Sequence, residues 1–189
     1  GSYLEMSRFK PTDKDFEENF NLDLFKENNI KLLVTVGGDD TASTANRISK
    51  FLAAKNYPIA NIHCPKTIDN DLYGTDHCPG FGSAAKYIAT SCMELYKDTC
   101  VYSTGTVNVV EIMGRHAGWL TASAALATEY GNGCGPDLIY LPEIDFDLDQ
   151  FTEDVTKIMK QKRNVLVAVS EGLHYADGSF VSEANSFVT

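Results

Sequence analysis

The first residues suited to chemistry are Gly37-Gly38-Asp39-Asp40, directly after a stretch that reads as a β-strand. Glycines at a strand end let the backbone approach a phosphate, and the next helix offers free N–H groups. Asp39 there could hold Mg²⁺ between phosphate oxygens, because this ion prefers one or two carboxylates plus substrate phosphates. A tight turn with Asp39 or Asp40 as an N-cap explains the same residues, so both interpretations stay open.

The second segment follows the next strand along the chain and reads Pro65-Lys66-Thr67-Ile68-Asp69-Asn70-Asp71. Because the carboxyl ends of parallel strands meet at one sheet edge, we expect this segment to lie at the same edge as Asp39. A carboxylate beside a lysine suits removal of a proton from a hydroxyl, while the cation offsets charge on a phosphoryl group. An Asx-rich loop whose carboxylates cap nearby backbone is the alternative.

Two further segments with charged residues stand at predicted strand ends. Met113-Gly114-Arg115 contains a guanidinium that can bind a phosphate with two hydrogen bonds or clamp a sugar. Glu171 can accept hydrogen bonds from sugar hydroxyls, although a carboxylate facing water would look the same in sequence.

Strands and helices alternate along the chain, as the spacing of apolar residues indicates. We expect strands at residues 30–36, 59–64, 107–113, 137–141 and 164–169, and helices at residues 14–29, 41–55, 80–95, 119–127 and 149–160. This alternation predicts an α/β fold, a Rossmann-like three-layer sandwich of parallel sheets with helices on both faces. The first strand reads as a buried one.

The composition limits what the chain can bind. Its 189 residues carry a formal net charge of −10, which argues against nucleic-acid or anionic-membrane binding, since both need clustered Lys and Arg. A few placed cations and backbone N–H groups still suffice for phosphate ligands. The five cysteines contain no Cys-x-x-Cys pair, and no apolar run approaches the ~18 residues of a membrane span. We therefore expect free thiols and a cytoplasmic protein.

Taken in this order, Gly-Gly-Asp-Asp, Pro-Lys-Thr-Ile-Asp-Asn-Asp, Met-Gly-Arg and Glu-Gly resemble the phosphofructokinase family over essentially the whole chain. The resemblance implies a glycolytic phosphotransferase that acts on fructose 6-phosphate with Mg²⁺. It implies two lobes, a donor-binding part in residues 1–80 and a sugar-phosphate-binding part in residues 81–189. It also implies that the chain is a truncated internal piece, and that the full-length form is a homo-oligomer.

The resemblance assigns roles to the residues quoted above. Asp69 would be the base that takes the proton from the 1-hydroxyl of the sugar. The substrate would also contact Thr67, Ile68, Asp71, Met113, Gly114, Arg115 and Glu171, with Arg115 near the transferring phosphoryl group. The donor would contact Gly37, Gly38, Asp40 and Lys66, and Asp39 would serve the magnesium ion.

Asp40 and Lys66 imply that the donor is pyrophosphate. ATP-using bacterial members of the family carry glycine at both positions, whereas pyrophosphate-dependent members carry Asp and Lys. A carboxylate at Asp40 would fill and charge the space that an α-phosphate needs, and Lys66 would supply a cation to the leaving phosphate. Two alternatives remain: an ATP-dependent phosphofructokinase, which Asp40 opposes, and a non-catalytic regulatory paralogue, which should have lost Asp69.

Overall fold

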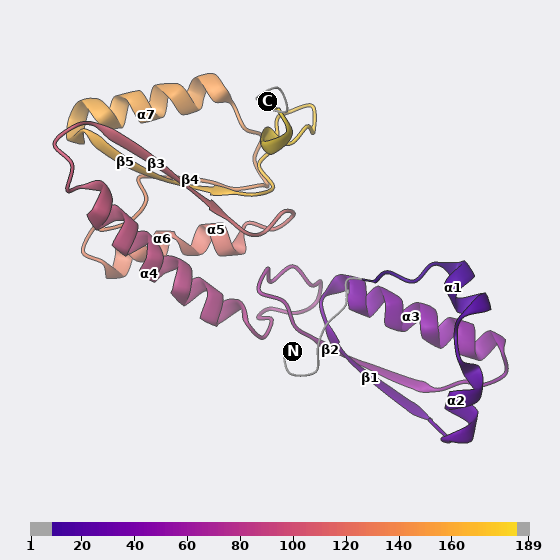
Figure 1. The fold of residues 1–189 in the computed structure, drawn as a ribbon. Coiled ribbons are helices and arrows are strands. Elements are labelled where there is room, and N and C mark those ends of the chain that lie inside the picture. Colours follow the sequence, from indigo (N-terminus) through magenta and orange to yellow (C-terminus); the bar gives the residue numbers. More distant parts are fainter. Residues whose placement is uncertain (1–8, 185–189) are drawn as a thin grey trace. The chain divides into compact units, whose positions relative to one another are not determined.

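The computed structural model describes residues 9–184, and in it the chain folds into two compact units that divide between Lys66 and Thr67. This division falls earlier in the chain than the one expected between residues 80 and 81. Each unit contains its own parallel sheet (Figure 1).

The first unit is built around strands β1 (Leu32–Gly37) and β2 (Ala60–Pro65), which pair in parallel. Helix α3 (Asp39–Ala54) connects them and packs on both strands. Residues 14–29 form two short helices, α1 (Asp13–Glu18) and α2 (Leu22–Glu27), where one was expected. The break occurs because Asn21 caps α2, its side chain accepting a hydrogen bond from the Leu24 N–H at 3.0 Å.

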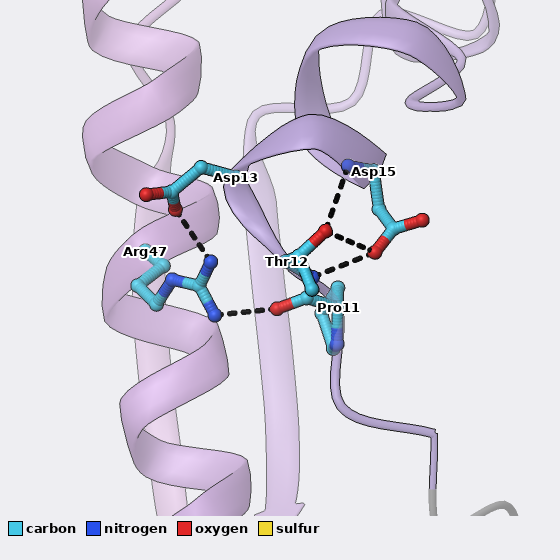
Figure 2. A network of polar contacts seen from close by, with 5 residues as sticks. All are labelled: Pro11, Thr12, Asp13, Asp15 and Arg47. Atoms are coloured by element: carbon cyan, nitrogen blue, oxygen red, sulfur yellow. Dashed lines mark hydrogen bonds and ion pairs between the residues drawn. The ribbon is translucent and has the colours of Figure 1, made fainter.

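An arginine of α3 fastens the start of α1 to that helix. The Arg47 guanidinium donates to the Pro11 carbonyl at 2.5 Å and to Asp13 Oδ1 at 2.6 Å (Figure 2). Its Cζ also lies 4.9 Å from the centroid of the Phe16 ring, a cation–π contact. Because α3 begins at Asp39, this network holds the segment before α1 against the helix that starts at the predicted donor site.

Strand β1 differs from the expectation of a buried strand. Its side chains alternate between faces, and Leu32, Val34 and Val36 remain 50%, 52% and 65% exposed. The intervening Leu33 and Thr35 are half-buried. The expectation of a buried strand is therefore wrong for β1, because α3 packs on one face of its sheet and the apolar residues of the other face stay accessible in this chain.

The second unit has the expected three layers. Its sheet has the order β3-β5-β4, all parallel, formed by Thr106–Ile112, Asn164–Ser170 and Leu138–Tyr140. Figure 1 shows α7 (Leu148–Lys162) on one face, and on the other α4 (Phe81–Thr99), α5 (Trp119–Ser123) and α6 (Ala125–Tyr130). Helices α5 and α6 replace the single helix expected at residues 119–127. A 3₁₀ helix, η2 (Val181–Glu183), follows the sheet. Covered on both faces and both edges, Val165 to Ala168 of β5 are each 0% exposed.

Candidate functional site

The predicted donor residues of the first unit gather at the carboxyl edge of the β1–β2 sheet. The Lys66 N–H donates to the Gly37 carbonyl at 2.8 Å, which joins the two strand ends. Gly37 is buried, and a Cβ there would lie 2.3 Å from Thr41 Oγ1, so only glycine fits. Gly38 is the N-cap of the 16-residue α3 and makes no side-chain cap bond. The first-turn N–H groups are thus offered to an anion.

Asp40 has an ion partner that the sequence did not indicate. Lys10 Nζ lies 2.8 Å from Asp40 Oδ2, and both side chains are 72% exposed. The two residues are thirty positions apart, so no local spacing could reveal the pair. The ammonium group offsets part of the negative charge that Asp40 places at the start of α3.

Asp39 fits the requirement of a magnesium ion shared with substrate. Its carboxylate is exposed at the first position of α3. Within residues 9–184 no three His, Cys, Asp or Glu side chains gather closely enough to hold an ion by themselves. An ion at Asp39 would therefore take most of its oxygen ligands from phosphates and water, as Mg²⁺ does in phosphoryl-transfer sites.

The loop with the predicted base is closed by its own polar residues. Thr67 forms an isolated parallel β-bridge with Gly80, and its Oγ1 accepts a hydrogen bond from the Asp69 N–H at 3.2 Å. Asn70 is 7% exposed, and its Oδ1 accepts from the Cys78 N–H at 2.8 Å. Its φ of 56° lies in the left-handed region, which asparagine tolerates better than most residues. Asn70, to which the sequence gave no role, thus anchors the loop that presents Asp69.

The two predicted sugar-phosphate segments are joined directly. Strands β3 and β5 are neighbours, and the Glu171 N–H continues their pairing by donating to the Ile112 carbonyl at 2.9 Å. The Gly114 N–H donates to Glu171 Oε1 at 3.0 Å. Arg115 is exposed, and its Cζ lies 5.4 Å from the centroid of the Phe180 ring, a contact that the sequence did not indicate.

A cavity of about 480 Å³ lies between α4 and β3. Its lining is mainly apolar and includes Ile68 from the base loop and Met113 from the end of β3, which places these two segments side by side. An apolar lining does not suit a charged sugar phosphate. The Ile68 side chain also packs against the core of the unit, so any contact with substrate would come from its backbone.

The sequence model of the family described as Phosphofructokinase matches residues 1–187. The chain belongs to the phosphofructokinase family. It is 43% identical over 168 residues to a pyrophosphate–fructose 6-phosphate 1-phosphotransferase of Halomonas elongata, covering 87% of this chain and 40% of that protein. It is 40% identical over 150 residues to a sulfofructose kinase of Alkalicoccus urumqiensis, covering 78% of this chain and 38% of that one.

Solved phosphofructokinase structures match the fold. A pyrophosphate-dependent phosphofructokinase from Marinobacter aquaeolei superposes with a TM-score of 0.76 at 38% identity, over 93% of this chain and 44% of that one. The corresponding enzyme from Nitrosospira multiformis gives 0.77 at 40% identity, over 91% and 43%. The chain thus spans about 40% of the length of the curated relatives named above. No helix within the described residues has the length and apolar character to cross a membrane.

Proposed function

We propose that the full-length protein transfers a phosphoryl group from pyrophosphate to the 1-hydroxyl of fructose 6-phosphate, giving fructose 1,6-bisphosphate and orthophosphate. The observation that carries the proposal is the joining of Gly37 to Lys66 at one sheet edge, beside Asp40 at the start of α3. Support also comes from the relatives at 40% to 43% identity that are named pyrophosphate–fructose 6-phosphate 1-phosphotransferases.

In the proposed reaction the Asp69 carboxylate accepts the proton of the 1-hydroxyl. The sugar oxygen bonds to the nearer phosphorus of pyrophosphate as the bridging P–O bond breaks, and orthophosphate leaves with the bridging oxygen. Lys66 offsets charge on the leaving phosphate, and Arg115 does so on the transferring group. Mg²⁺ held through Asp39 would neutralise donor oxygens when bound.

Asp40 is the basis for proposing pyrophosphate over ATP as the donor. An α-phosphate beside it would meet a carboxylate, and like charges in contact disfavour binding. Pyrophosphate carries no further phosphate and stops short of that space, and the ammonium group of Lys10, 2.8 Å from Asp40, offsets the weaker repulsion that acts over the remaining distance. If the protein were an ATP-dependent phosphofructokinase, Asp40 would have no function in donor binding. If it were a non-catalytic paralogue, Asp69 would have no function as a base.

The test is phosphoryl transfer by the full-length protein with Mg²⁺, comparing pyrophosphate with ATP as donor. Each donor is assayed with fructose 6-phosphate and with sulfofructose as acceptor, since a sulfofructose kinase is among the relatives. Turnover of fructose 6-phosphate with pyrophosphate alone is the expected result. Equal or faster turnover with ATP would overturn the role of Asp40, and turnover of sulfofructose alone would overturn the acceptor. No turnover with any pair would favour the non-catalytic paralogue.

The proposal extends to the setting of the enzyme. A reducing compartment such as the cytoplasm is supported by the five cysteines, all of which are unpaired thiols. A role in glycolysis follows from the proposed reaction. We take the full-length enzyme to be a homo-oligomer, which light scattering coupled to size-exclusion chromatography would test.

A further inference from the structure

Gly114 is held at both of its backbone polar groups by two consecutive residues, Ser170 at the end of β5 and Glu171 directly after it. Its N–H donates to Glu171 Oε1 at 3.0 Å, and its carbonyl accepts from Ser170 Oγ at 2.7 Å. The same Ser170 Oγ accepts from the Gly172 N–H at 3.0 Å. Ser170 is 3% exposed, so these bonds are shielded from competing water.

The conformation fixed in this way is one that the chain would not keep by itself. Gly114 has a φ of 122°. Glycine adopts positive and negative φ values about equally readily, so an unconstrained glycine would move between several backbone conformations. The two loops also lie backbone against backbone, because a Cβ on Gly172 would come within 1.8 Å of the Arg115 carbonyl oxygen. The orientation of Arg115 relative to β3 therefore depends on the hydrogen bonds that fix the backbone of Gly114.

We propose that Ser170 is a positioning residue for recognition of the sugar phosphate, an inference that rests on the function proposed above. Its hydroxyl fixes the carbonyl of Gly114, and Glu171 fixes the N–H of the same residue. Ser170 is too buried to touch substrate itself. It acts by keeping Arg115 and Glu171 in one relative arrangement, whereas Gly37, Gly38, Asp40 and Lys66 belong to the other unit.

The test compares Ser170→Ala, Ser170→Cys and Ser170→Thr in the full-length enzyme. Ala removes the hydroxyl, Cys keeps nearly the same shape with a much weaker donor, and Thr keeps the hydroxyl. Leaving the buried Gly114 carbonyl unpaired should raise KM for fructose 6-phosphate about tenfold in the Ala and Cys variants. KM for pyrophosphate should rise less than KM for the sugar, because Gly37, Gly38, Asp40 and Lys66 belong to the other unit and only Arg115 is shared between the two substrates. Ser170→Thr should retain the original KM for the sugar.

The matched control is Ser123→Ala. Ser123 is also buried, at 7% exposure, and its Oγ donates to the Leu120 carbonyl at 2.6 Å within its own helical turn. Its loss should lower stability without changing KM for either substrate. An unchanged sugar KM in Ser170→Cys would overturn the proposal, and so would an equal rise in Ser123→Ala or in the KM for pyrophosphate. If Ser170→Ala does not fold, the KM for fructose 6-phosphate of the near-isosteric Ser170→Cys variant decides between the two outcomes.

A second measurement separates this inference from the proposed reaction. Without pyrophosphate-dependent turnover in the unsubstituted enzyme, the proposed function fails, but hydrogen–deuterium exchange still tests the contact. Peptides covering residues 113–118 and 170–174 should exchange faster in Ser170→Cys than in the unsubstituted protein and in Ser123→Ala. Equal exchange in all three would overturn the role of Ser170 in holding the loops.

Discussion

Replacing Gly172 by alanine tests the close packing of the two loops that are proposed to bind the sugar phosphate, residues 113–118 and 170–174. The new Cβ would lie 1.8 Å from the Arg115 carbonyl oxygen, 2.5 Å from its carbonyl carbon and 2.7 Å from its Cα. These are backbone atoms, which cannot rotate away as the end of a side chain can. Reaching the 3.4 Å at which ordinary van der Waals contact begins requires a shift of about 1.6 Å between the loops.

A shift of this size should affect both function and stability. Misplacing a substrate-binding group by about 1 Å can cost about 100-fold in rate, so kcat/KM for fructose 6-phosphate should fall by about that factor. Overpacking should lower the free energy of unfolding by about 1–3 kcal/mol. The assays are steady-state kinetics of the full-length enzyme with each substrate varied, and chemical denaturation.

The matched control is Gly133→Ala in the same unit. Gly133 has a φ of 84° and open space around it, with no atom within 4 Å of an added Cβ. Alanine there should cost about 1 kcal/mol of backbone strain and leave kcat/KM unchanged. If Gly172→Ala kept the original kcat/KM for fructose 6-phosphate, or if Gly133→Ala lost as much, the close packing of the loops would be refuted as the cause.

Three further predictions concern the other residues of the site and its support. Asp69→Ser should abolish turnover but keep fructose 6-phosphate binding in calorimetry; retained turnover would contradict its role as base. Lys10→Met should raise KM for pyrophosphate without changing stability, because its pair with Asp40 is exposed; an unchanged KM would show that Lys10 plays no part in donor binding. Arg47→Met should lower the free energy of unfolding of the first unit by about 1 kcal/mol, measured by denaturation, whereas the exposed Lys50→Met should not.

Local pattern was enough to predict the α/β class and the order of strands and helices along the chain. The run from Asn164 to Val169, apolar after its first residue, predicts a strand, and β5 spans Asn164–Ser170. The Gly37 turn and the Met113–Gly114–Arg115 segment were predicted at strand ends for the same reason, since a strand stops where its apolar run stops. The four motifs in their order were also enough to predict the family.

Tertiary structure decided the features that depend on residues far apart in the chain. Whether Val34 is buried depends on what covers each face of its sheet, and an apolar strand reads the same with one covered face as with two. The ion pair of Lys10 with Asp40 and the bonds that hold Gly114 between Ser170 and Glu171 join segments separated by about 30 and 56 positions. Periodicity describes neighbours along one element, and such contacts arise only when separate elements fold against each other.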